Sequence, residues 1–116
     1  MRERDIERTL TKAVRTMGGI CFKFVSPGNA GVPDRIVLLP PPTGQSANPN
    51  ALPGQQKTPR IVFVELKADG GVLSPRQRVQ IERIKKLGFD VRVLTGAELV
   101  RDFIDEMRGK KGGDAL

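Results

Sequence analysis

Three charged side chains stand at the ends of two apolar segments. Glu65 and Lys67 close a segment that starts at Arg60 and is rich in β-branched residues. Because side chains alternate between the faces of a strand, these two residues point the same way. Asp34 precedes a second apolar segment, 35–39. Two carboxylates and an ammonium group at adjacent strand ends can hold a divalent cation and a water molecule.

This set of residues suits hydrolysis of a phosphodiester bond. The reaction needs neutralised charge at the phosphate, an activated water and a stabilised leaving oxygen, and Mg²⁺ supplies much of this when a few carboxylates hold it. We expect Asp34 and Glu65 to be metal ligands, with the backbone carbonyl of Leu66 as a third oxygen. Lys67 is expected to orient or deprotonate the water, or to offset charge on the phosphorus.

Two further polar residues are candidates for the same site. Gln77 shares a predicted helix face with Ile81 and Ile84, and a polar group on an inward face should meet a polar partner. Glu7 lies close to the apolar stripe of the first predicted helix and is a candidate fourth metal ligand. Glu3, four residues earlier, competes with it for that role.

The elements that must position these residues follow from apolar periodicity and turn signals. Helices are predicted over 2–17 and 75–87, and a third is predicted to open at Thr95-Gly96-Ala97-Glu98. Its apolar face is expected to carry Leu99, Val100, Phe103, Ile104 and Met107. Strands are predicted over 20–25, 35–39, 60–67 and 89–94.

Turn and cap signals mark the boundaries of these elements. Gly18-Gly19 is expected to end the first helix. Ser74-Pro75-Arg76-Gln77 has the pattern of a capping box, and Thr95 to Glu98 has the same pattern. In the fourth strand Phe89, Val91 and Val93 are expected to face inward.

The predicted order is α-β-β-β-α-β-α within one domain, residues 1–116. The strand-helix-strand unit over 60–94 predicts two parallel strands, and the first three strands can form an antiparallel meander. The fold class is therefore α/β (α+β), with a mixed central sheet flanked by helices. Segment 40–59, rich in Pro, Gly, Asn and Gln, is predicted to be a flexible loop, and 108–116 a frayed tail.

Composition excludes several classes of function. The chain has no histidine, which excludes histidine acid/base catalysis, Ser-His triads and ordinary zinc sites. Its one cysteine, Cys21, allows no internal disulfide and suits a reducing cytoplasm. No signal peptide and no apolar run long enough to span a bilayer are apparent. We expect no membrane partner and no organic cofactor.

The charge balance points to a polyanionic partner. Twenty Lys and Arg against thirteen Asp and Glu give a formal net charge of +7, which favours nucleic acid. With no Trp or Tyr, base stacking cannot be the main source of affinity. Candidate contacts to the DNA backbone are Lys23, Arg35, Arg76 and Arg78. Lys23 is equally compatible with a surface lysine, Arg35 could instead pair with a carboxylate, and Arg76 and Arg78 could be merely solvated.

The ordered motifs resemble a known family. Gly31-Val32-Pro33-Asp34, then Val64-Glu65-Leu66-Lys67, then Ser74-Pro75-Arg76-Gln77 look like the virus-type replication-repair nuclease (VRR-NUC) family of the PD-(D/E)XK nuclease superfamily. Phe24-Val25-Ser26-Pro27-Gly28 and the segment 88–93 resemble it as well. The match covers roughly residues 3 to 105 and is judged by motif order.

The resemblance implies a restriction-endonuclease-like αβββαβ core that depends on Mg²⁺ or Mn²⁺. It assigns metal ligation to Asp34 and Glu65, the catalytic lysine to Lys67 and the motif glutamine to Gln77, with Glu7 as the first-helix glutamate. It also implies a phage or prophage endonuclease that acts as a homodimer on branched DNA, such as four-way (Holliday) junctions, and leaves a 5′ phosphate.

Two readings of other classes compete with a nuclease. A noncatalytic, basic nucleic-acid-binding module would bind DNA in a salt-sensitive way without a Mg²⁺-dependent product. A small structural protein of a nucleoprotein assembly would depend on its partners for folding or solubility. The binding module leaves the carboxylates at the strand ends unexplained, since carboxylates repel DNA.

Overall fold

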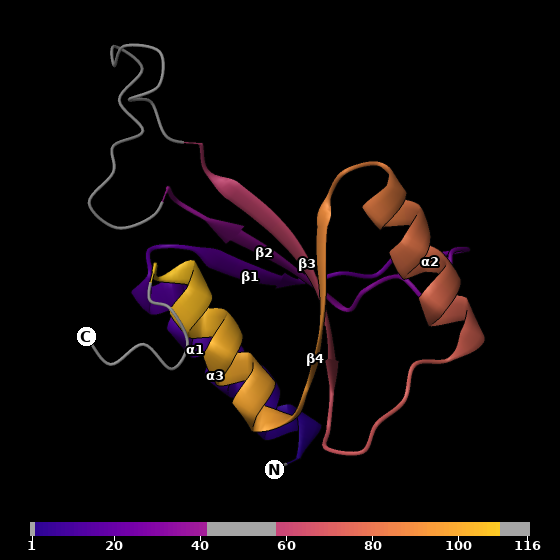
Figure 1. Ribbon diagram of the computed structural model, residues 1–116, viewed down its shortest axis with the longest axis horizontal. Helices are drawn as coiled ribbons and strands as arrows, with labels where there is room; N and C mark the ends of the chain where they lie inside the picture. Colours follow the sequence, from indigo (N-terminus) through magenta and orange to yellow (C-terminus); the bar gives the residue numbers. More distant parts are fainter. Residues whose placement is uncertain (1, 42–57, 110–116) are drawn as a thin grey trace.

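A four-stranded mixed sheet forms the centre of the computed structural model, which describes residues 2–41 and 58–109 (Figure 1). The elements occur in the order α1 (Glu3–Thr16), β1 (Ile20–Lys23), β2 (Arg35–Leu39), β3 (Arg60–Lys67), α2 (Pro75–Lys86), β4 (Asp90–Thr95) and α3 (Gly96–Met107). The predicted order and fold class are confirmed. The segments 42–57 and 110–116, which hold most of the predicted loop and tail, lie outside the described residues.

The strands are arranged in the order β1-β2-β3-β4. β1 pairs with β2 and β2 with β3 in antiparallel fashion, whereas β3 and β4 are parallel, as the α2 crossover requires. α1 and α3 lie together on one side of the sheet and α2 lies on the other (Figure 1). The predicted meander and crossover are therefore both present.

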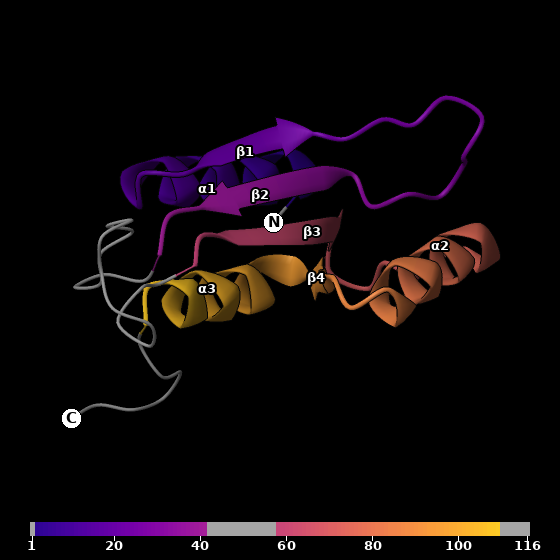
Figure 2. The ribbon, with the colours of Figure 1, turned by 90° about the horizontal axis from the view of Figure 1, so that it is seen from above.

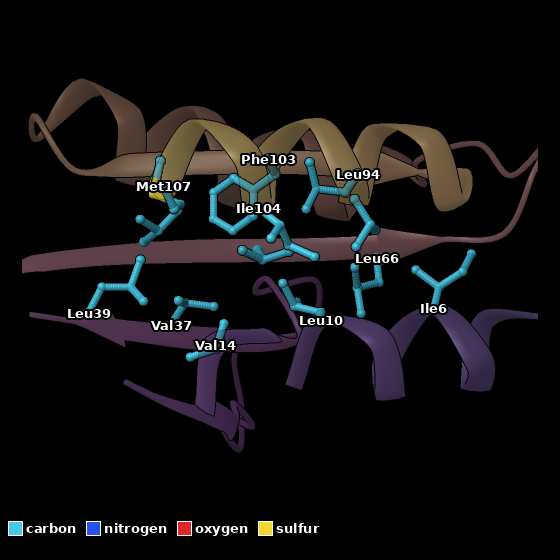
Figure 3. Packing of buried hydrophobic residues seen from close by; sticks show 13 residues of the cluster. Ile6, Leu10, Val14, Val37, Leu39, Leu66, Leu94, Phe103, Ile104 and Met107 are labelled. Atoms are coloured by element: carbon cyan, nitrogen blue, oxygen red, sulfur yellow. The ribbon is translucent and has the colours of Figure 1, made fainter. Parts of the chain in front are cut away.

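The hydrophobic core lies between the sheet and the pair α1 and α3 (Figure 3). α1 buries Ile6, Leu10 and Val14 at helical spacing, and β3 buries every second residue, Val62, Val64 and Leu66. α3 completes the core with a stripe of four residues, Val100, Phe103, Ile104 and Met107. The alternation on β3 leaves Glu65 and Lys67 on the opposite face of the sheet.

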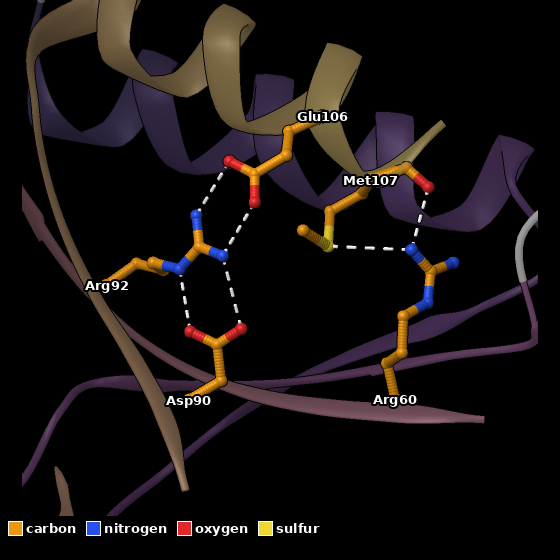
Figure 4. A network of polar contacts seen from close by, with 5 residues as sticks. All are labelled: Arg60, Asp90, Arg92, Glu106 and Met107. Carbon is orange, nitrogen blue, oxygen red and sulfur yellow. Dashed lines mark hydrogen bonds and ion pairs between the residues drawn. The ribbon is translucent and has the colours of Figure 1, made fainter. Parts of the chain in front are cut away.

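Two arginines fix α3 against the sheet (Figure 4). Arg92 on β4 donates hydrogen bonds to both carboxylate oxygens of Asp90 and of Glu106. Arg60, at the start of β3, donates to the backbone oxygen of Met107 and to that of Pro40, each at 2.8 Å. Charged groups placed on the last carbonyls of a helix satisfy acceptors that have no partner within it.

Four local predictions differ from the structure. β1 ends at Lys23; Phe24 still donates its backbone N–H to the Asp34 carbonyl at 2.8 Å, after which the chain enters the turn that begins at Ser26. Thr95 makes no side-chain cap bond, since it is the last residue of β4 and Gly96, with φ of 87°, turns the chain into α3. Phe89 and Leu99 are exposed rather than buried.

Phe89 shows why the expected burial of alternate residues in the fourth strand was wrong. It shares a face with Val91, which is buried, but it precedes β4 and lies beyond the end of α2. β4 instead buries Val91 on one face and Leu94 on the other, because helices cover both faces of this parallel strand. Strict alternation was therefore the wrong pattern for this strand.

Candidate active site

The two predicted carboxylates lie on the same face of the sheet. Arg35 on β2 is the partner of Val64 on β3, so the next rung of the ladder places Asp34 opposite Glu65. The backbone N–H of Leu66 also reaches Oδ1 of Asp34, 3.4 Å away. The register of an antiparallel pair thus converts a separation of 31 positions in the chain into direct apposition.

Lys67 and Gln77 both approach Glu65. Nζ of Lys67 lies 3.9 Å from Oε2 of Glu65, as expected for residues two apart on one strand face. Nε2 of Gln77, one turn into α2, donates a hydrogen bond to the same oxygen at 3.1 Å. The structure therefore brings together four of the predicted residues, Asp34, Glu65, Lys67 and Gln77.

The predicted capping box at the start of α2 is present. The Ser74 hydroxyl accepts a hydrogen bond from the backbone N–H of Gln77, and the Gln77 side-chain oxygen accepts one from the backbone N–H of Ser74. The side-chain amide of Gln77 thus serves both the helix end and the carboxylate. Sequence predicted each contact separately but not their combination in one side chain.

Gly31 allows the loop before Asp34 to rest directly on α2. Its φ is 94°, and a Cβ atom there would lie 2.7 Å from the backbone carbonyl of Arg76 and 2.9 Å from the backbone nitrogen of Gln77. Only glycine tolerates both the backbone angle and the contact. Figure 2 shows this loop reaching over α2 from the ends of β1 and β2.

Both carboxylates lie in surroundings that disfavour their ionised form. Burial raises the pKa of Asp34 to about 6, although the Leu66 amide and the Arg35 charge oppose it. Burial and then the charge of Asp34 raise the pKa of Glu65 to about 7, with Lys67 opposing. A cation placed between the two groups would relieve this repulsion.

One carboxylate oxygen of Glu65, Oε1, is buried and has no hydrogen-bond partner within residues 2–41 and 58–109. The residue as a whole is 4% exposed. An unpaired buried carboxylate oxygen is costly unless a cation or water meets it. Together with Asp34 and the adjoining Leu66 peptide, it offers the hard oxygen ligands that Mg²⁺ prefers.

Two glutamates of α1, Glu7 and Glu3, are the sequence candidates for a further metal-binding carboxylate. Glu7 forms an ion pair with Arg35, whereas the charge of Glu3 acts on both Asp34 and Glu65 and raises their pKa values. In the described part of the chain no three acidic, cysteine or histidine side chains form a group that could hold a metal. Glu3 is therefore the better placed of the two α1 candidates, without reaching the pair itself.

The predicted DNA-contacting cations occupy two regions. Lys23 and Arg35 are partners across β1 and β2, and the Arg35 side chain is only 11% exposed. Arg76 and Arg78 are exposed on the first turn of α2, on either side of Gln77. Both regions adjoin the carboxylates, although neither was distinguished by sequence from an ordinary charged surface.

Comparison with known proteins shows the family of the chain. The VRR-NUC domain family model matches residues 9–98. A relative in Acyrthosiphon pisum secondary endosymbiont phage 1, "Putative nuclease p44", is 40% identical over 99 residues, which are 85% of this chain and 88% of that protein. Glu65 and the three residues around it, Asp34, Lys67 and Gln77, fall inside the range that the family model matches.

Solved structures share the fold. One described as a VRR_NUC domain superposes with a TM-score of 0.68 at 24% identity, over 90% of this chain and 96% of the other. A second, a VRR_NUC domain protein, has a TM-score of 0.60 at 16% identity, over 100% and 95%. The chain belongs to the VRR-NUC family.

Proposed function

We propose that the protein is a metal-dependent DNA endonuclease that hydrolyses phosphodiester bonds. The observation that carries this proposal is the convergence of Asp34, Glu65, Lys67 and Gln77 around a buried carboxylate oxygen that has no partner among the described residues. The family and the phage relative named as a nuclease support it. The proposed setting is the cytoplasm of a bacterial host or a phage-infected cell.

Each side chain has a proposed role. Asp34, Glu65 and the Leu66 carbonyl would hold Mg²⁺, for which Mn²⁺ would substitute; the ion supplies charge neutralisation at the phosphate and at the leaving oxygen. Lys67 positions the attacking water beside the phosphorus and offsets charge developing there. Gln77 holds Oε2 of Glu65, so that Oε1 keeps a fixed direction.

The direct test is a cleavage assay on labelled four-way junction, flap and linear duplex DNA, with and without Mg²⁺. Asp34→Ala, Glu65→Ala and Lys67→Ala should each lose cleavage by about 10³-fold or more while still binding DNA. Asp102→Ala, which removes an exposed carboxylate on α3, is the matched control and should cut normally. Normal cutting by either acidic-site variant contradicts the assigned site.

Branched DNA is the proposed substrate, and a homodimer the proposed active form. Symmetric nicking of a four-way junction needs two sites, which a two-fold dimer provides. The sheet face opposite the core supports self-association: Ile20, Phe22 and Ile61 are each at least half exposed there, and β2 adds Ile36 and Leu38. We propose a second copy as the occupant of this face.

The dimer proposal has its own measurement. Sedimentation at micromolar concentration, with junction DNA present, should give a dimer for the wild-type protein and a shift to monomer for Phe22→Lys. Leu99→Lys, which makes the same kind of change at an exposed apolar residue of α3 on the other side of the sheet, is the control and should remain a dimer. A wild-type protein that sediments only as monomer removes this proposal but leaves the nuclease site untouched.

A further inference from the structure

The exposed side of α1 carries a row of cations. Arg8, Lys12 and Arg15 follow one another at spacings of four and three residues, which places them on one helical face. All three are exposed, and within residues 2–41 and 58–109 none forms an ion pair or a side-chain hydrogen bond. They lie opposite the buried stripe of α1, so packing in the described fold does not require them.

These cations line a groove beside the sheet. A concavity of about 520 Å³ is formed by Glu7, Arg8, Thr11, Lys12, Arg15 and Arg35. Its walls carry four positive groups and one carboxylate, Glu7, which is already paired with Arg35. The groove therefore presents a positive surface to solvent, and its only acid is neutralised within it.

The groove reaches the residue next to Asp34. Arg35, which lines the groove and pairs with Glu7, directly follows Asp34 in the chain. From Arg8 to Arg15 the helix rises about 10 Å at 1.5 Å per residue. One DNA strand carries a phosphate about every 3.4 Å along its axis, so this distance corresponds to about three phosphates. The spacing of the three α1 cations therefore matches that of about three phosphates.

We propose that this α1 groove binds the phosphate backbone of the nucleic acid as the strand runs away from the scissile phosphate. The inference rests on the proposed nuclease function and extends it, because it names the surface that aligns the substrate. Contacts of this kind set position and register without reading sequence. If the groove makes these contacts, the positive charge of α1 determines the affinity for DNA, rather than the net charge of the whole chain.

The test compares two triple variants with the same net charge. Arg8→Gln/Lys12→Gln/Arg15→Gln and Arg83→Gln/Lys85→Gln/Lys86→Gln each remove three positive charges, the second set from the far end of α2. Binding to labelled duplex and junction DNA is measured by fluorescence anisotropy in EDTA, across a series of KCl concentrations. Chelation prevents cleavage, so the readout is affinity alone.

The α1 variant should lose at least tenfold in affinity near 0.1 M KCl, and its slope of log K against log salt should fall by about 2 to 3, since each phosphate contact contributes about 0.9. The α2 variant should change its slope by less than 1. Arg8→Lys/Arg15→Lys, which keeps the charge, should match the wild type. Circular dichroism melting establishes that each variant is folded.

Equal effects of the two triple variants overturn the inference, because net charge alone would then explain binding. An α1 variant with the wild-type slope overturns it as well. Neither result touches the nuclease proposal, which the Mg²⁺-dependent cleavage assay decides separately. Conversely, a wild-type protein that never cuts would refute the nuclease while leaving the anisotropy result interpretable.

Discussion

Gln77 connects the end of a helix to the carboxylate of Glu65. Its Nε2 donates to Oε2 of Glu65 at 3.1 Å, while its Oε1 accepts from the backbone N–H of Ser74 at 2.9 Å. A backbone N–H can only donate, so the cap forces the amide oxygen toward Ser74 and the NH₂ group toward Glu65. The first turn of α2 therefore sets the direction of this hydrogen bond at the candidate active site.

Two substitutions at Gln77 should distinguish its role in capping α2 from its role beside Glu65. Gln77→Leu loses both contacts, so cleavage should fall about 10- to 100-fold and the free energy of unfolding by about 1 kcal/mol. Gln77→Glu keeps an acceptor for Ser74, since glutamate is favoured at this capping position, but turns a second carboxylate toward Glu65. At pH 5, where Glu65 with its pKa of about 7 is protonated and can donate to the new carboxylate, it should fold with near wild-type stability. Its cleavage should be as poor as that of Gln77→Leu. Wild-type cleavage by Gln77→Glu, measured beside its urea denaturation, would refute a role in the site.

Gly31 should be far less tolerant of substitution than Gly28. Both have positive φ, 94° and 81°, so alanine strains the backbone at each by about 1–2 kcal/mol. At Gly28 nothing lies within 4 Å of the added methyl group, whereas at Gly31 it meets the backbone of Arg76 and Gln77. Gly31→Ala should therefore cost at least about 2 kcal/mol more than Gly28→Ala in urea unfolding. Equal costs would mean that the loop moves off α2 freely.

The sequence predicted the site because local rules place its residues. Alternation along a strand orients Glu65 and Lys67, and the capping box fixes where α2 begins and hence where Gln77 lies. The β2 and β3 boundaries, 35–39 and 60–67, agree with the structure for the same reason. Apposition of Asp34 and Glu65 required only that these two strands pair in the expected register.

Features that depend on tertiary contacts could not be predicted from the sequence. Nothing local distinguishes Phe89, which lies exposed against the Phe63 ring with centroids 6.1 Å apart, from a buried strand residue. The pairing of Glu7 with Arg35 depends on how α1 crosses the sheet, and so does the nearness of Glu3 to the carboxylates. The row of cations on α1 could be recognised as a surface only from the groove that these residues line together with Arg35.

Arg92 should contribute more to stability than an ordinary surface cation. It bonds to Asp90 and Glu106 together and lies 5.6 Å from the centre of the Phe103 ring. Lysine cannot reproduce the paired geometry of a guanidinium. Arg92→Lys should lower the free energy of unfolding by about 1 kcal/mol, and less in 1 M KCl, where ion pairs are screened. Arg101→Lys on α3 is the exposed control and should have no measurable effect.

Stability without metal should fall as pH rises through neutrality. The pKa of Glu65 is raised from its ordinary 4.5 to about 7 in the folded chain, chiefly by burial. Between these values the folded state holds a proton that the unfolded state has released, so each rise in pH favours unfolding. The contribution is fully present below about pH 4.5 and lost as pH passes 7. The raised pKa of Asp34 acts in the same direction.

Glu65→Gln removes the Glu65 share of this dependence, because the amide keeps the shape of the side chain without the charge. In EDTA at pH 8 it should be more stable than the wild type by about 1–3 kcal/mol, taking 1.36 kcal/mol per pKa unit and allowing for solvent screening. At pH 4 the two proteins should differ by less than about 0.5 kcal/mol, and Asp102→Asn should follow the wild type at every pH. Urea denaturation across this range gives the slopes directly. Identical slopes for Glu65→Gln and the wild type would show that the Glu65 carboxyl is not held protonated in the fold, and the strain that a bound cation is proposed to relieve would be absent.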